Sequence, residues 1–508
     1  MGFVDTFKST LIVKSIENLR QDADASNMKR ALTGKDVVLI GTGEIIGAGI
    51  FVITGTAAAN HAGPAIILSF IISGIICAFA GLCYSEMASV VPVSGSAYTF
   101  TYATVGELVA WMIGWDLMLE YLMGAAAVAV GWSSYLVKFL HTCGLESDPT
   151  WTSAPVGFTD ADGFSTTGAI MNLPAIAISL FCTAILCFGI RQTAWVNHAA
   201  VAIKLSVILI FLFATFSYIN PENWKPFIPE AHNGKDYGFK GVLRASTMVF
   251  FAYIGFDAVS TCAQEVKNPA RDMPIGILGS LGLCTVLYIL VSMNLTGIAP
   301  YESLNSAAPL ADAVANLGMT WLRVLVGLGG VAGLSSVILV SLMAQPRIFY
   351  TMAHDGLLPA AFGKIHPKWG TPVLPTIVSG VFCAVAAGVL PIDVLGDITS
   401  AGTLFAFFLV CLSVTVLRFT RPDLPRPFKV PLGPFIIPIL GAASSMGLIV
   451  TTGWPTVLRL LIWMALGMIV YVTFSYRHSR LRTGKVPEGL EGVDEKHAAG
   501  NEKHVETV

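Results

Sequence analysis

The chain has 508 residues, of which 54% are hydrophobic and only 12% are charged, and its mean hydropathy is +0.71. Soluble domains carry about 25% charged residues, so this composition excludes an ordinary soluble protein and indicates an integral membrane protein. The net charge of −2 favours neither a nucleic-acid partner nor an acidic surface as a target.

Twelve apolar runs are long enough to cross a bilayer as helices, since each crossing needs about 20 mostly apolar residues. In chain order they cover approximately residues 36–57, 64–88, 97–140, 170–190, 195–218, 240–263, 274–298, 320–350, 374–391, 399–418, 433–452 and 455–476. The third and eighth runs exceed a minimal span, so we expect them to tilt or to extend past the bilayer. The sequence thus predicts an all-α integral membrane protein with twelve transmembrane helices.

The distribution of lysine and arginine predicts the orientation of these helices. With the N-terminus inside, 22 of the 30 basic residues fall in cytoplasmic loops and tails, seven lie outside, and Lys204 lies within a run. This asymmetry follows the positive-inside rule. Residues 1–35 lack a signal-peptide pattern, so we expect this N-terminal tail to stay attached and cytoplasmic. Residues 477–508 form a polar, charged C-terminal tail, which we expect to be cytoplasmic and disordered.

The first run contains the stretch Gly41-Thr-Gly-Glu-Ile-Ile-Gly-Ala-Gly-Ile-Phe51, with four glycines and one carboxylate. A glycine costs a helix interior about 1 kcal/mol relative to alanine, and Gly47 and Gly49 fall within one turn. The stretch therefore predicts a broken helix, whose unpaired backbone groups are tolerated at membrane depth only when buried in protein or lining a cavity. We interpret the break as a binding site; the alternative is that the glycines only permit close helix packing.

A second interruption lies in the sixth run, where Gly255 and Asp257 stand in an apolar sequence. Many transporters are built from inverted repeats with paired interruptions at the substrate site. If runs one to five (36–218) and six to ten (240–418) are two such repeats, each break falls in the first helix of a repeat. Residues 433–476 then supply two additional helices.

Two broken helices that cross at mid-membrane present both partially negative and partially positive backbone groups. The free carbonyls where a half-helix ends attract cations, and the free N–H groups where the next begins attract anions. A zwitterionic amino acid fits this arrangement. Its carboxylate would bind the N–H groups of Ala48 and Gly49, and its ammonium group would bind the carbonyls near Ile45, Phe251 and Ala252.

Four polar side chains within the runs are further candidates for functional residues. Three of them are charged, and a charge inside a membrane is costly and usually functional. Glu120 could meet a cationic substrate side chain or carry a proton, or form a structural pair with a backbone N–H. Lys204 could gain and lose a proton during transport, or act as a permanent positive strut. Glu44 could add negative charge to the pocket, or only face the cytoplasmic vestibule. Ser341 could leave room for a long substrate side chain, or only allow helices to approach.

No enzyme or metal-site signature is found in the sequence. There is no GxxxxGK[ST] phosphate loop, no HExxH and no GxSxG. The nine cysteines include no CxxC pair, and only Cys143 lies in a polar loop, so they predict neither a disulfide framework nor a metal site. We therefore expect a protein that is not an enzyme and uses no metal or cofactor.

The stretches around the two interruptions resemble the amino acid–polyamine–organocation transporters. The motifs that carry this resemblance are Gly-x-Gly-x-Ile-Ile-Gly-x-Gly-Ile-Phe at 41–51, Tyr84-x-Glu86…Pro92-x-Ser-Gly-Ser-Ala-Tyr98 and Phe250-Phe-Ala-Tyr-Ile-Gly-Phe-Asp257. Three further motifs resemble the cationic amino acid transporter branch in particular. They are Glu265-x-x-Asn-Pro269…Asp272-x-Pro-x-Gly276, Arg347…Asp355-Gly-x-Leu-Pro359 and Ala401-Gly-Thr-Leu404.

The resemblance implies a LeuT-type fold of five-plus-five inverted repeats with two additional C-terminal helices, in which helices 1 and 6 are broken. It also implies secondary transport by alternating access, with proton coupling at Lys204. Glu120 matches the acid on the third helix of this branch. Ala48 replaces a hydroxyl residue of many relatives, and Glu44 stands where small or apolar residues are commoner. The amino acid moiety of the substrate is expected at Ile45, Ala48, Gly49, Phe251, Ala252 and Ile254.

The leading hypothesis is a proton-coupled transporter that imports L-amino acids across the plasma (inner) membrane. Glu44, Glu120 and Ser341 favour cationic substrates such as arginine and lysine. The alternatives are a transporter of small neutral amino acids such as alanine, a non-transporting amino acid receptor with the same fold and, as a weaker option, a channel. The expected partners are the amino acid, protons and the lipid bilayer, with no nucleic acid; the sequence leaves open a small single-helix membrane partner.

Overall fold

The computed structural model describes residues 13–17, 19, 32–93, 95–159, 163–188, 190–230, 237–306, 308–367, 369 and 371–484. Most of the predicted N-terminal tail lies outside these residues. So does most of the predicted C-terminal tail, from residue 485 to residue 508, which includes most of the segment expected to be disordered.

Helices form almost all of the regular structure in this part of the chain. The longer α-helices are α3 (Gly34–Ile45), α5 (Ile66–Val90), α6 (Ser96–Tyr102), α7 (Glu107–Thr142), α8 (Leu173–Phe188), α9 (Ile190–Thr215), α10 (Gly238–Phe250), α11 (Pro269–Ile298), α12 (Pro309–Asn316), α13 (Thr320–His354), α14 (Val373–Val389), α15 (Ile392–Thr420), α16 (Ile436–Thr451) and α17 (Trp454–Val470). The short ones are α4 (Thr54–Ala57), α18 (Tyr476–His478) and α19 (Arg480–Thr483).

Two short strands interrupt this helical pattern in the connection between α7 and α8. They are β1 (Val156–Thr159) and β2 (Gly163–Thr166), and they pair antiparallel with Val156 opposite Thr166. The chain is therefore mostly helical rather than all-α.

Each of the twelve predicted runs contains a helix. Eight helical segments of the described chain are long and apolar enough to cross a membrane, and α8, α14 and α16 are shorter apolar helices. These lengths and compositions confirm a mostly helical membrane protein.

The third predicted run, 97–140, is wrong as a single element because it contains a turn. Helix α6 ends at Tyr102 and α7 begins at Glu107. Between them Gly106 has φ +124°, a backbone conformation that glycine adopts far more readily than other residues. The carbonyl of Thr101 accepts the N–H groups of Val105 (2.8 Å) and Gly106 (3.2 Å). Uncharged turn residues do not interrupt an apolar run, so hydropathy conceals this turn.

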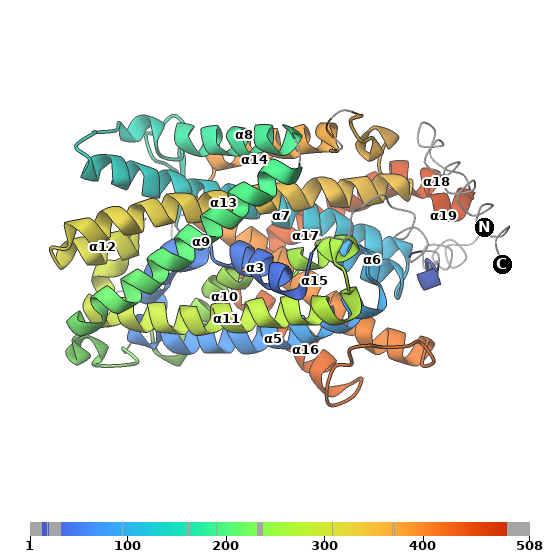
Figure 1. Ribbon diagram of the computed structural model, residues 1–508, viewed down its shortest axis with the longest axis horizontal. Helices are drawn as coiled ribbons and strands as arrows, with labels where there is room; N and C mark the ends of the chain where they lie inside the picture. The colour runs from blue at the N-terminus through green and yellow to red at the C-terminus, as the bar shows by residue number, and fades with distance from the viewer. Residues whose placement is uncertain are drawn as a thin grey trace.

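The C-terminal half of the short helix α3, from Gly41 to Ile45, is buried among much longer helices. Figure 1 shows α13 running past it and α11 alongside α5, and α3 packs against α9, α11 and α13. Small residues permit this approach: a Cβ atom on Gly276 of α11 would lie 2.1 Å from Cγ1 of Val37, and one on Gly41 would lie 2.6 Å from Oγ of Ser280. Close packing, the simpler interpretation of the glycines in the first run, therefore accounts for Gly41.

Candidate functional site

The first interruption follows directly after α3. The helix ends at Ile45, and Ile46 has an extended backbone with φ −75° and ψ 92°. The chain resumes at Gly49 with a π-helical turn, Gly49–Ile53, followed by α4. Gly47 lies between the two pieces and against α13, where a Cβ atom would stand 3.1 Å from Cγ2 of Val337.

The second interruption follows α10. A 3₁₀ turn, Phe251–Tyr253, ends in an extended residue, Ile254, with φ −59° and ψ 136°. Gly255 has φ +121°, which only glycine adopts without strain. The chain then continues as a second 3₁₀ segment, Ala258–Glu265. Because 3₁₀ helices longer than three or four residues are uncommon and often mark hinges, this segment is unusual.

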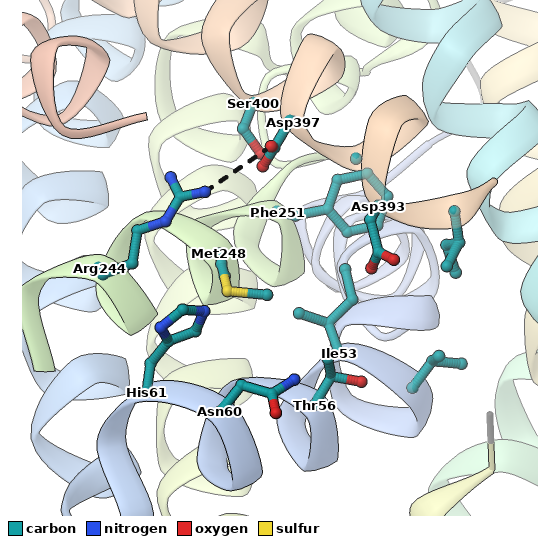
Figure 2. A pocket seen from close by; sticks show the side chains of 13 residues that line it. Ile53, Thr56, Asn60, His61, Arg244, Met248, Phe251, Asp393, Asp397 and Ser400 are labelled. Atoms are coloured by element: carbon teal, nitrogen blue, oxygen red, sulfur yellow. Dashed lines mark ion pairs between the residues drawn. The ribbon is translucent and has the colours of Figure 1, made fainter. Parts of the chain in front are cut away.

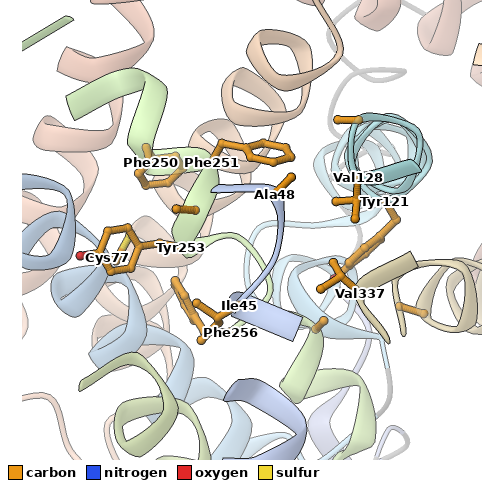
Figure 3. Packing of buried hydrophobic residues seen from close by; sticks show 14 of the residues in the cluster. Ile45, Ala48, Cys77, Tyr121, Val128, Phe250, Phe251, Tyr253, Phe256 and Val337 are labelled. Carbon is orange, nitrogen blue, oxygen red and sulfur yellow. The ribbon is translucent and has the colours of Figure 1, made fainter. Parts of the chain in front are cut away.

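The two interruptions meet at Gly49 and Ala252. A Cβ atom on Gly49 would lie 2.2 Å from the Cα atom of Ala252, so only glycine permits this close contact between the two interrupted segments. Figure 3 shows the same region, with Ala48 near Phe251 and Ile45 near Phe256. We call this contact, together with residues 45–49 and 251–255, the junction.

Tyr288 of α11 links the two carbonyl ends at the junction. Its hydroxyl oxygen lies 2.6 Å from the carbonyl oxygen of Ile45 and 2.7 Å from that of Ala252. A hydroxyl carries one proton, so it can donate to only one of the two carbonyls at a time. The sequence analysis assigned the carbonyls near Ile45 and Ala252 to a substrate ammonium group. In the structure both of these carbonyl oxygens lie against the Tyr288 hydroxyl group. The sequence analysis missed Tyr288, because a tyrosine in an apolar run carries no signal of its own.

Lys204 of α9 lies fully buried beside the first interruption. Its ammonium group donates to the carbonyl oxygen of Gly43, to that of Ile46 at 2.8 Å and to Oγ of Ser336 at 2.9 Å. These contacts use all three of its donors. A positive charge at the end of a helix is favourable because the helix dipole is negative there. The contacts are compatible with both the proton carrier and the strut.

Glu44 lies buried at the junction rather than in an open vestibule, since its exposed fraction is 4%. A Cβ atom on Gly255 would lie 2.4 Å from Cγ of Glu44, so the side chain packs directly on the second interruption. Its Oε1 atom accepts a hydrogen bond of 2.7 Å from Ser341. Its Oε2 atom is buried and accepts none from the described residues. Ser341, predicted to leave room for a substrate side chain, thus contacts Glu44.

Glu120 of α7 lies near the second interruption and is also buried. Neither carboxylate oxygen accepts a hydrogen bond within the described part of the chain, and the neighbouring hydroxyl of Thr403 donates to the carbonyl of Thr399 at 3.0 Å. The acid of the interruption itself, Asp257, accepts hydrogen bonds from the hydroxyl of Tyr121 (2.7 Å) and from the N–H of Gly255 (3.3 Å). Asp257 therefore stabilises the turn, whereas Glu120, like Oε2 of Glu44, keeps acceptors that the described residues do not use.

A cavity of about 180 Å³ opens beside the junction, and Figure 2 shows the side chains around it. Phe251 is the one predicted substrate residue in its wall. Ile45, Ala48 and Ala252 are buried in the packed junction, each with an exposed fraction of 1%. We call this space the Arg244 cavity. Its lining residues are Val52, Ile53, Thr56, Asn60, His61, Arg244, Met248, Phe251, Ile392, Asp393, Gly396, Asp397 and Ser400.

Sequence comparison supplies the family. The amino acid permease family matches residues 32–475. Two Bacillus subtilis proteins align over 92% of this chain and 98% of their own length: a methylthioribose transporter, 42% identical over 468 residues, and a branched-chain amino acid permease, 43% identical over 471 residues. A vacuolar cationic amino acid transporter of Arabidopsis thaliana is 38% identical over 413 residues, which are 81% of this chain and 67% of the relative.

These matches agree with the motifs around the two interruptions and cover nearly all of the described helices. They also confirm that the chain is not an enzyme, because the family consists of permeases. The family implies an amino acid as the substrate. The chain is a multi-pass membrane protein of the amino acid permease family, within the amino acid–polyamine–organocation superfamily.

Proposed function

We propose that this permease is a secondary active transporter that imports L-amino acids by alternating access and is coupled to protons. The observation that carries the proposal is the meeting of two interrupted helices at Gly49 and Ala252. The proposal includes a LeuT-type arrangement of two five-helix repeats with two additional helices, which makes twelve crossings. It also places the protein in the plasma membrane with both termini cytoplasmic.

In this proposal the substrate backbone binds main-chain atoms of the junction. The first N–H groups of a helix have no carbonyl partners, because no helical turn precedes them. At the turn that begins at Gly49, the N–H groups of Ala48 and Gly49 therefore bind the substrate carboxylate in this proposal. The carbonyls of Ile45 and Ala252, which now meet at Tyr288, receive the ammonium group. Phe251 and Ile254 contact the rest of the substrate.

Proton coupling is assigned to Lys204. Its ammonium group holds the carbonyls of Gly43 and Ile46, which belong to the last turn of α3 and the interruption after it. Loss of the proton would remove a donor and the positive charge from this helix end. The protonation state of Lys204 would thereby change the stability of the interruption that binds substrate.

Cationic substrates are favoured by Glu44 and Glu120. Both are buried, and Oε2 of Glu44 and both oxygens of Glu120 accept no hydrogen bond from the described residues. A buried acceptor without a partner is costly, and the ammonium or guanidinium group of lysine or arginine would supply one. Ser341 holds the Glu44 carboxylate in place.

Neutral substrates are the second candidate, because the chain is 43% identical to a branched-chain amino acid permease over 92% of its length. For a neutral substrate, Glu44 and Glu120 would have to be satisfied by protons instead of by the substrate. The two candidates therefore differ in which molecule neutralises the buried acids.

Uptake into proteoliposomes distinguishes these possibilities. Purified protein would be given labelled arginine, lysine, leucine or alanine, with and without an imposed inward proton gradient. We expect accumulation of arginine or lysine above equilibrium only with the gradient. Accumulation of leucine or alanine alone would favour the neutral candidate, and saturable binding without flux would indicate a receptor. Gradient-independent accumulation would contradict proton coupling.

Replacing Glu120 by glutamine tests the contact with the substrate side chain. The amide keeps the shape and removes the charge, so we expect the KM for arginine to rise by about tenfold, the effect of losing one hydrogen bond to a charged group. The KM for alanine should change much less. Equal losses for both substrates, measured in the same liposomes, would mean that Glu120 does not contact the side chain.

A further inference from the structure

Asp116 of α7 is a buried acid that the proposed transport mechanism does not use. Its side chain has an exposed fraction of 0%, and neither carboxyl oxygen accepts a hydrogen bond from the described residues. Within the same part of the chain, no lysine, arginine or histidine forms an ion pair with it. An unpaired carboxylate in an apolar interior is far costlier than a neutral acid. Asp116 therefore holds a proton in this conformation.

Two contacts define the surroundings of Asp116. A Cβ atom on Gly402 of α15 would lie 3.0 Å from its Oδ1 atom and 3.5 Å from its Cγ atom, so the glycine leaves space for the carboxyl group. On α7 itself, Glu120 follows four residues later on the same face of the helix, and the two acids interact electrostatically. Glu120 also interacts with Asp257 of the second interruption. The acids thus form a series that leads from the junction along α7.

The other charged side chains around α7 do not neutralise Asp116. Helix α7 packs against α6, α8, α13, α14, α15 and α17, and α6, α8 and α14 contain no charged residue. None of the charged residues on the remaining three helices hydrogen-bonds to Asp116. They are Arg323, Arg347 and His354 of α13, Asp393, Asp397 and Arg418 of α15, and Arg459 of α17. The tyrosines of α6, Tyr98 and Tyr102, donate to Asp355 and Glu107 instead.

Asp116 lies on the cytoplasmic side of Glu120 in the proposed orientation. At a rise of 1.5 Å per residue, Asp116 is about 14 Å along the axis from Glu107, where α7 begins, and Glu120 is about 6 Å further. Glu107 itself is neutralised by Arg482, whose Nε atom lies 2.7 Å away. A proton on Asp116 is therefore closer to the cytoplasm than a proton on Glu120.

We propose that Asp116 is a second proton-binding group of the transport cycle, additional to Lys204. The inference rests on the proposed proton-coupled transport. When the cytoplasmic side opens, water reaches the carboxyl group, its O–H bond breaks and the proton passes to water. The carboxylate then regains a proton from Glu120, which in turn takes one from the water that enters the junction from outside. Each cycle thereby moves two protons, one on Lys204 and one on Asp116.

Replacing Asp116 by asparagine tests whether this proton leaves, because the amide has the shape of the neutral acid but no proton to release. Full-length protein in proteoliposomes would accumulate the labelled amino acid that the wild type imports, under an inward gradient of about one pH unit. Valinomycin and equal potassium on both sides would hold the membrane potential at zero. Each coupled proton then multiplies the accumulation ratio by about ten. We expect about 100-fold accumulation by the wild type and about tenfold by Asp116→Asn.

The matched control is Asp423→Asn, which removes an exposed acid in the connection after α15. It should accumulate the amino acid about 100-fold, as the wild type does. Exchange of labelled for unlabelled amino acid needs no gradient and should persist in Asp116→Asn, which shows that the variant is folded. Asp116→Asn should also differ from a variant that lacks Lys204, because Lys204 holds the interruption that binds substrate and its loss uncouples the whole cycle.

Equal accumulation by Asp116→Asn and the wild type would overturn the inference, because Asp116 would then be a permanently neutral acid. A wild-type ratio of only about tenfold would also overturn it and leave coupling to one proton intact. This second measurement needs no variant, so it decides the question even if Asp116→Asn fails to fold. Absence of any gradient-driven accumulation by the wild type would contradict the proposed function itself.

Discussion

Replacing Lys204 by alanine should abolish accumulation driven by a proton gradient, so that the labelled amino acid inside the liposomes only reaches the outside concentration. The ammonium group is the donor for the carbonyls of Gly43 and Ile46 and contacts Ser336. Alanine removes both the charge that we assign to proton coupling and the donor at the end of α3. Exchange of labelled for unlabelled substrate, which needs no gradient, should persist.

The control for this prediction is Lys138→Ala, which removes a lysine from an ion pair with Asp312 rather than from the carbonyls of Gly43 and Ile46. It should keep gradient-driven accumulation. If Lys204→Ala still accumulates substrate against its gradient, Lys204 is a structural strut for α3. A loss of exchange together with a lowered melting temperature would show that the variant fails to fold, and Lys204→Met, which keeps the volume, would then be compared.

Replacing Glu44 by glutamine should remove the discrimination between arginine and citrulline. These amino acids have nearly the same shape, but citrulline carries a neutral ureido group in place of the guanidinium group. In the wild type we expect Oε2 of Glu44, which accepts no hydrogen bond from the described residues, to favour the charged ligand. A hydrogen bond to a charged group contributes about 1.5–3 kcal/mol, so we expect arginine affinity to fall by about tenfold or more.

Citrulline serves as the internal control for Glu44→Gln, because a general defect of the junction would weaken both ligands equally. Ser341→Ala provides a second comparison: it keeps the carboxylate but removes the 2.7 Å hydrogen bond that positions it. Its effect on arginine should have the same direction and be smaller. Equal losses for arginine and citrulline in Glu44→Gln would show that Glu44 does not contact the substrate side chain.

The positions of the two interruptions could be predicted because their cause is local. Gly47 and Gly49 weaken one turn of a helix, and Gly255 adopts a positive φ in the second. The same local argument failed at Gly106, where an uncharged turn divides the third run into α6 and α7. Hydropathy measures the affinity of a segment for the membrane and is insensitive to a single backbone rotation.

The partners of the buried charges could not be predicted, because they come from distant parts of the chain. Glu44 and Ser341 are 297 residues apart, and Tyr288 reaches the carbonyl of Ile45 from another helix. The sequence analysis gave Arg244 no role in a site. Only the packing of α10 near α15 reveals its proximity to Asp397.

The most direct test of the account is an experimental structure with the transported amino acid bound. We predict density for the ligand between residues 45–49 and 251–254, with its carboxylate about 3 Å from the N–H groups of Ala48 and Gly49, a normal hydrogen-bond distance. Its ammonium group should lie equally close to the carbonyls of Ile45 and Ala252, which now share the Tyr288 hydroxyl group. A ligand bound elsewhere, with Gly49 and Ala252 still in contact, would contradict the assignment of the junction as the substrate site.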